Sequence, residues 1–213
     1  MTDESEDLDE EARPRRKCRG PAKVSRKKLE NAALHYLQRF STSSEGLRRV
    51  LMRRVWHSAR HNGSDADEGA KWANEVVAKM QACGFVNDRL FAEGRVRSLL
   101  ARGKPLRGIR LQLHEKGVGQ EIIDEVFRLV EEEDGDVDFA AAMALAKRRR
   151  LGPYSTRPNR FERREKDMAA MARAGFDFET ARCIIDAETP DDLESIKNGG
   201  ENSRMLGYFP DDL

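Results

Sequence analysis

The stretch GFVNDRLFAEGRVRSLLARGKPLRGIRLQLHEKGV, residues 84–118, decides the fold of this chain. Its apolar residues recur at helical spacing in two blocks: Ala92, Val96 and Leu99, then Leu106, Ile109 and Leu113. Gly103 and Gly117 follow these blocks as typical helix stops, and Pro105 stands where a first-turn proline is favoured. The stretch therefore predicts two short helices joined by a tight turn.

The same stretch is strongly basic, with eight Lys or Arg residues against three acids. Six of the cations are our candidate contacts for a partner: Arg95, Arg102, Lys104, Arg107, Arg110 and Lys116. The planar guanidinium of arginine suits both phosphates and carboxylates, because it donates two parallel hydrogen bonds. We expect a basic face that binds DNA, acidic protein patches, or both. The alternative is solvated charge with helical ion pairs such as Glu93–Arg97.

The composition favours a helical protein with a wide solvated surface. Charged residues make up 36% of the 213 residues, and no β-branched run alternates with the period of a strand. The net charge of +1 hides strong segregation, because residues 3–11 hold seven acids and residues 13–28 hold nine bases. Separated blocks of charge indicate charged partners. The basic block is expected either to add non-specific DNA affinity or to be neutralised by the acids before it.

The cysteines and the terminus favour a cytoplasmic location. The three cysteines are far apart without a CxxC pair, as in a reducing compartment, and we expect Cys83 and Cys183 to be small core residues. The acidic N-terminus lacks the apolar region of a signal peptide, and no run approaches the ~18 apolar residues of a membrane span. We therefore expect a soluble cytoplasmic protein with no membrane partner.

Nine helical segments are expected, and their joins resemble one another. LRRVLMRRV is similar to IRLQLHEKGV, and LHEKGVGQEIIDEVF is similar to MARAGFDFETARCII. A recurring unit of this kind indicates a quasi-linear array. We predict an all-α fold of three tandem three-helix repeats in an elongated, curved right- or left-handed array. The expected division is a disordered charged tail over 1–25, repeats over 26–84, 85–134 and 135–188, and an acidic tail over 189–213.

The third repeat carries a basic loop insertion, KRRRLGPYSTRPNRFERR. Basic loops track nucleic-acid backbones without reading sequence, so this loop is a second candidate contact for DNA. Its candidate residues are Lys147, Arg148, Arg149, Arg150, Arg157 and Arg160. The alternative is a solvated loop with no partner.

Known catalytic motifs are absent from the sequence. It contains no GxxxxGK[ST], GxSxG or HExxH pattern, so we expect no enzyme activity and no catalytic residue. His57 and His61 have metal-ligand spacing but lack a third ligand, so we expect neither a metal nor a cofactor. Trp56 and Trp72 are expected to pack between the first helices.

The central stretch resembles the signature of the RecX family, regulators of the RecA recombinase. The matching residues are Gly84, Phe85, Asn87, Asp88, Phe91, Ala92, Arg97, Ser98, Gly103, Pro105, Ile109, Leu113, Lys116 and Gly117. ALHYLQRFSTSSEGLRRVLMRR resembles the first unit of the family and MARAGFDFETARCII the third, so the resemblance spans roughly residues 26–188.

The resemblance implies three tandem three-helix repeats and a role in DNA repair, recombination and the SOS response. It further implies a protein that binds RecA and its filament on single-stranded DNA, meeting the DNA directly or through the filament. Such binding modulates, and mostly inhibits, filament extension, ATP hydrolysis and strand exchange. We expect a monomer. The alternative is a stand-alone DNA-binding protein without sequence specificity.

Overall fold

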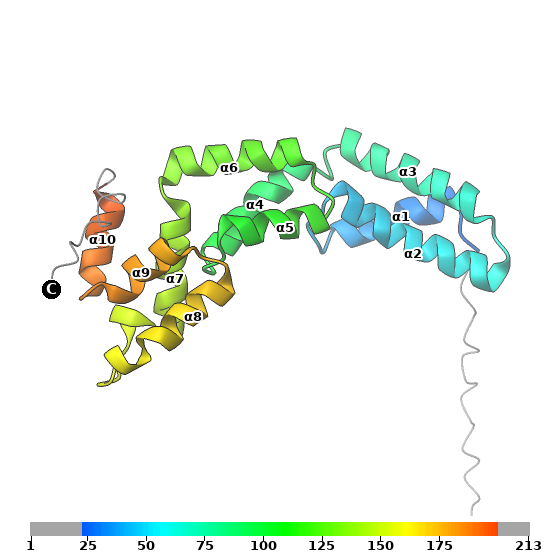
Figure 1. Cartoon of the computed structure of the whole chain (residues 1–213). Coiled ribbons are helices and arrows are strands. Elements are labelled where there is room, and N and C mark those ends of the chain that lie inside the picture. Colours follow the sequence, from blue (N-terminus) through cyan, green and yellow to red (C-terminus); the bar gives the residue numbers. More distant parts are fainter. Residues whose placement is uncertain (1–22, 200–213) are drawn as a thin grey trace, which may run out of the picture.

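The structure, a computed structural model, describes residues 23–199. Most of the two expected tails, residues 1–22 and 200–213, therefore lies outside the described residues. Between them the chain forms ten α-helices and two short 3-10 helices, and no strand occurs in this range. Figure 1 shows the helices in successive groups along an elongated, curved body.

The first group is a three-helix unit. Its helices are α1 (Arg26–Leu37), α2 (Ser44–Asn62) and α3 (Ala66–Ala82). Leu29, Leu51 and Met80, one from each helix, are almost fully buried in a common core. Val24, which we expected in a disordered tail, is also buried there, and its backbone amide donates to the Ser58 hydroxyl at 2.8 Å. The ordered first unit therefore begins before α1.

The second group forms a core of its own. Its helices are α4 (Asp88–Leu100), α5 (Leu106–Glu115) and α6 (Gln120–Asp134). The apolar stripes predicted from the central stretch meet in this core, where Val96, Ile109 and Leu113 are fully buried with Ile123 of α6. The two predicted helices and the turn between them are thus present.

The third group contains more helix than the sequence predicted. Its elements are α7 (Val137–Arg149), the 3-10 helices η1 (Gly152–Tyr154) and η2 (Phe161–Arg163), α8 (Arg164–Ala174), α9 (Phe178–Asp186) and α10 (Pro190–Asn198). Residues 190–198 are a helix and not part of an acidic tail, because Thr189 and Asp192 form a capping box and Leu193 is fully buried. The buried carboxylate of Asp167 accepts from the Gly152 amide at 3.1 Å and ties the inserted loop to α8.

At each junction between units, a carboxylate of one unit caps a helix of the unit before it. The Asp88 carboxylate, in the first turn of α4, accepts from the Ser44 backbone amide at 2.7 Å and so caps α2. Asp138, in the first turn of α7, accepts from the Leu106 amide at 2.7 Å and caps α5 in the same way. In both junctions an aspartate in the first helix of one unit accepts from a free backbone amide at the N-terminus of the second helix of the unit before it.

Two glycines permit the close approach of the units. Gly103 has φ +69, and a Cβ there would lie 2.6 Å from the backbone nitrogen of Leu145 on α7. Gly117 has φ +76, and a Cβ there would overlap the Glu45 side chain at the start of α2. Both positions need a left-handed backbone and leave no room for a side chain.

Two predictions about single residues of the first unit are wrong. Trp56 is 58% exposed and Cys83 is also exposed, so neither is a core residue. Trp56 lies inside α2 but on the side away from its buried residues, and Cys83 is the C-cap that follows the last residue of α3.

Candidate interaction surface

The six cations predicted to form a basic face lie on α4, on α5 and in the turns that follow them. Arg95 is half-buried on α4, while Arg102 and Lys104 are exposed in the α4–α5 turn. Arg107 and Arg110 lie on α5, and Lys116 follows its last residue. These positions bring the six residues onto one unit, but their environments differ.

Arg110 is already engaged within the protein. Its guanidinium forms an ion pair with Asp124 of α6 and lies 4.8 Å from the centre of the Phe127 ring. The hydrogen bond from Arg110 is the main reason that the pKa of the Asp124 carboxyl is lowered. An arginine held on both sides in this way offers little of its charge to a partner.

The hollow beside α5 is formed with α6 and not with α4. It has a volume of about 380 Å³, and Asp124 and Glu131 line it together with Arg107, Arg110 and Arg128. Arg97 pairs with Glu133 of α6 at 2.7 Å, whereas the expected partner Glu93 pairs with Arg89 at 3.1 Å. Acids of α6 therefore neutralise part of the face.

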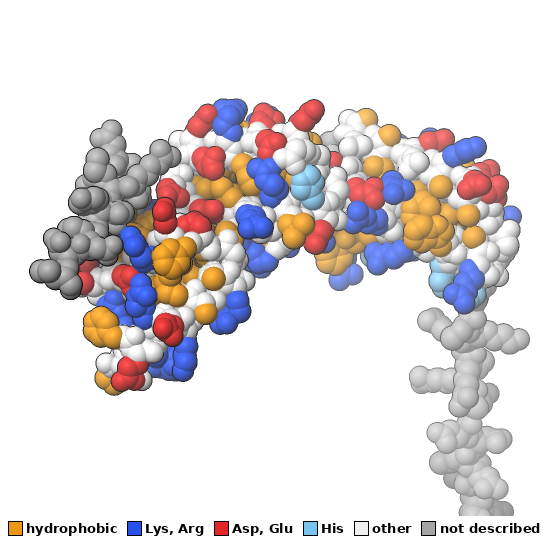
Figure 2. All heavy atoms as spheres, in the orientation of Figure 1, with side chains coloured by type: hydrophobic (Ala, Val, Ile, Leu, Met, Phe, Trp, Pro, Cys, Tyr) orange, Lys and Arg blue, Asp and Glu red, His pale blue; other side chains and the backbone are white. Residues whose placement is uncertain are grey.

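Three of the other predicted cations lie at a corner between the second and third units. Arg102, Lys104 and Arg107 form no ion pair within residues 23–199. Arg148 of α7 joins them, because its guanidinium donates to the Arg102 carbonyl at 2.5 Å. We call these four residues the basic corner. Figure 2 shows acidic side chains over α6 and basic side chains toward the inner edge of the curved body.

The second predicted group of DNA contacts, in and after α7, consists of five exposed residues and one residue that is held within the protein. Lys147, Arg148 and Arg149 occupy the last turn of α7, where cations are favourable for the helix dipole, and Arg150 ends the helix with φ 56. These four residues and Arg157 are exposed.

Arg160, the sixth residue predicted for this group, has a structural role. Its guanidinium donates to the carbonyls of Ile185 at 3.1 Å, Glu188 at 3.0 Å and Ala187, so it caps the end of α9. Because these carbonyls hold the guanidinium, Arg160 is not a free cation for DNA.

One group of cations was missed. Arg53 and Arg54 of α2 line a groove of about 760 Å³ with Lys28 of α1. The signal was present in the sequence, because residues 46–64 contain five arginines and no acid. It was read only as a repeat pattern, which says nothing about the surface that the arginines share.

The two histidines with metal-ligand spacing lie side by side on α2. The rings of His57 and His61 lie 4.4 Å apart, and no group of three His, Cys, Asp or Glu side chains suited to a metal occurs within residues 23–199. No helix in this range is both long and apolar enough to cross a membrane.

Comparison with known proteins gives the family. The family model described as RecX, second three-helix domain, matches residues 87–126, which include α4 and α5. The Regulatory protein RecX of Myxococcus xanthus is 41% identical over 168 residues, covering 78% of this chain and 89% of that protein. The chain belongs to the RecX family.

Further RecX proteins agree with this assignment. The Regulatory protein RecX of Agrobacterium fabrum is 31% identical over 168 residues, covering 78% of this chain and 85% of that protein. A crystal structure of regulatory protein RecX superposes with a TM-score of 0.52 at 20% identity, covering 76% of this chain and 72% of the other. At this identity the superposition speaks for the fold alone, and it confirms the predicted all-α RecX architecture.

Proposed function

We propose that this RecX-family chain is a non-catalytic regulator that acts in the cytoplasm as a monomer without a cofactor. It binds RecA and the RecA filament on single-stranded DNA, and mostly inhibits filament extension, ATP hydrolysis and strand exchange. The observation that carries the proposal is the basic corner of Arg102, Lys104, Arg107 and Arg148, at the edge of the unit that matches the RecX second domain.

The shape of the body supports this role. An elongated, curved array is suited to lie along a helical filament and to touch more than one protomer (Figure 1). The basic corner would then meet phosphates or carboxylates of the filament. A bound array would block the addition of further RecA subunits.

The test is ATP hydrolysis by the cognate RecA on single-stranded DNA, with this protein titrated well below the RecA concentration. We expect Lys104→Glu with Arg107→Glu to raise the half-inhibiting concentration about tenfold, which corresponds to about 1.4 kcal/mol. Lys71→Glu with Lys166→Glu is the control, because both lysines are exposed and the change in charge is the same. Equal inhibition by the two double variants would contradict the role of the corner.

The unpaired cations also favour a second candidate, a stand-alone DNA-binding protein. This function predicts tight binding to single-stranded DNA without RecA, falling steeply as salt increases. It also predicts that hydrolysis is inhibited only when enough protein is present to coat the DNA. Inhibition at a few molecules per filament would reject it.

A further inference from the structure

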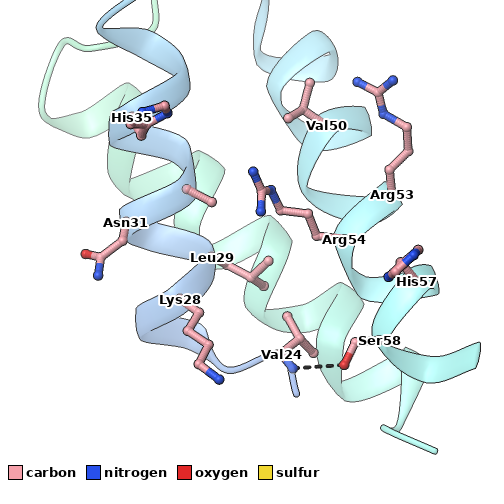
Figure 3. A pocket seen from close by; sticks show the side chains of 11 residues that line it. Val24, Lys28, Leu29, Asn31, His35, Val50, Arg53, Arg54, His57 and Ser58 are labelled. Atoms are coloured by element: carbon pink, nitrogen blue, oxygen red, sulfur yellow. Dashed lines mark hydrogen bonds between the residues drawn. The ribbon is translucent and has the colours of Figure 1, made fainter. Parts of the chain in front are cut away.

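The groove between α1 and α2 has a basic rim and an apolar floor. Val24, Leu29 and Val50 contribute apolar lining, and Lys28, Arg53 and Arg54 contribute three cations. Figure 3 shows the Arg54 side chain pointing from α2 into the space beside α1. Such a surface suits an extended chain that combines carboxylates with an aliphatic side chain.

No acid lines this groove. The nearby acids are engaged elsewhere, since Glu30 pairs with Lys79 and Glu75 pairs with Arg26 at 3.2 Å. Lys28, Arg53 and Arg54 form no ion pair within residues 23–199, although the Lys28 ammonium donates to the Lys23 carbonyl at 2.7 Å. The cations of the groove are therefore available to an anionic ligand.

The chain itself carries a segment of matching chemistry. Residues 3–11, DESEDLDEE, contain seven acids and no base, and Leu8 is their one aliphatic residue. With acids on both sides, Leu8 could contact the apolar floor while its neighbours meet the cations of the rim. A nucleic acid would satisfy the cations but would leave the aliphatic floor without a matching side chain.

The length of the connection permits this contact. Leu8 lies 24 − 8 = 16 residues before Val24, which itself lines the groove. A flexible chain of that length has a root-mean-square span of roughly 20–25 Å. The lining along α1, from Lys28 to His35, is about 10 Å long at 1.5 Å per residue. Tethering also gives the segment an effective concentration on the order of millimolar.

We propose that the α1–α2 groove binds acidic peptide segments, and that residues 3–11 of the same chain are its occupant. In this state the segment covers Lys28, Arg53 and Arg54 and shields them from other polyanions. The proposal concerns the first unit and does not depend on RecA binding.

The test compares amide proton–nitrogen spectra of the full chain with those of a full-length variant carrying D3N, E4Q, E6Q, D7N, D9N, E10Q and E11Q. We expect shift changes concentrated at groove residues such as Asn31, His35, Arg53 and His57. These differences should vanish at about 1 M salt, where the Debye length falls to about 3 Å. They should also be lost in a background of Arg53→Glu with Arg54→Glu, but not in the charge-matched background of Arg60→Glu with Lys71→Glu.

Three results would overturn the proposal. Shift changes confined to residues 13–28 would mean that the acids pair with the adjacent basic block. Groove shifts that depend on protein concentration would mean that the segment comes from a second copy. A groove unmoved by neutralising the acids, yet shifted when a thymidine oligonucleotide is added to the wild-type chain, would be a nucleic-acid site.

Discussion

The Asp88 carboxylate caps a helix other than its own. One oxygen accepts from the Ser44 backbone amide at 2.7 Å, and the other accepts from the Ser44 hydroxyl at 2.5 Å. The N-cap of α4 is instead Asn87, which accepts from the Leu90 amide at 3.1 Å. Asn87 therefore caps α4 and the adjacent Asp88 caps α2, so that Asp88 joins the first unit to the second.

We expect Asp88→Ala to lower the free energy of unfolding by about 1 kcal/mol, the usual loss when a capping side chain is removed. Urea denaturation followed by circular dichroism measures this. Glu121→Ala, in the first turn of α6, is the control, since Glu121 is exposed and forms no ion pair within residues 23–199. An equal loss in both variants would mean that Asp88 acts only through the dipole of α4.

Substitution by alanine should lower the free energy of unfolding at Gly103 and raise it at Gly94. Gly103→Ala adds a Cβ against the Leu145 backbone at a positive φ, so we expect a loss of about 2–4 kcal/mol. At Gly94, within α4, a Cβ meets nothing within 4 Å, and alanine should add about 0.5–1 kcal/mol through helix propensity. Thermal unfolding of the two variants gives the sign of each change. A stabilised Gly103→Ala protein would show that the second and third units are not in close contact.

Asp138 should make the junction between the second and third units sensitive to pH. Burial is the main reason that the pKa of its carboxyl is raised, and the Leu106 amide opposes this effect. As the pH falls, the folded state therefore binds the proton at a higher pH than the unfolded state does. The contribution of Asp138 to stability is thus largest at low pH and is lost as the pH rises through its folded-state pKa.

We expect Asp138→Asn to remove this dependence, because an amide oxygen still accepts from Leu106 and carries no charge. The free energy of unfolding of the wild type relative to Asp138→Asn should increase from neutral pH to about pH 4. Urea titrations of both proteins across that range measure the difference. A difference that decreases as the pH falls would contradict the raised pKa.

Substitution of Arg160 should lower stability, whereas substitution of Arg157 should weaken DNA binding. Arg160→Gln removes the bonds to the end of α9 and should cost about 1–2 kcal/mol of unfolding free energy. Arg157 is exposed, so Arg157→Gln should leave stability within about 0.5 kcal/mol. If the loop contacts DNA, Arg157→Gln alone should weaken binding to a fluorescent oligonucleotide at a temperature where both variants are folded. The opposite pattern would restore Arg160 as a contact residue.

The sequence predicted the helices and their buried faces better than it predicted which charged side chains form ion pairs. The stripe of Ile109 and Leu113 identified a buried helix face, because helical periodicity is a local property. The partner of Arg97 is Glu133, 36 residues away, and no spacing rule reveals such a contact. The charge of the basic face was overestimated for this reason. The free cations are those that form no ion pair with an acid across the fold.

The tenth helix was missed for a different reason. Its core-facing side presents mainly Leu193, so no apolar period was visible in residues 190–198. The capping box of Thr189 and Asp192, with proline at the first position, was a readable signal of its start. The acidic composition of the segment outweighed that signal in our interpretation.

The tenth helix also bears on how far such an array can grow. An end that displays a bare apolar face invites the next copy to stack, and copies that stack head to tail give filaments. Leu193 fills the core of the third unit, while Asp191, Asp192 and Glu194 face outward. The side of α10 that faces away from the core is thus charged, and another molecule that stacked on it would have to strip water from three carboxylates.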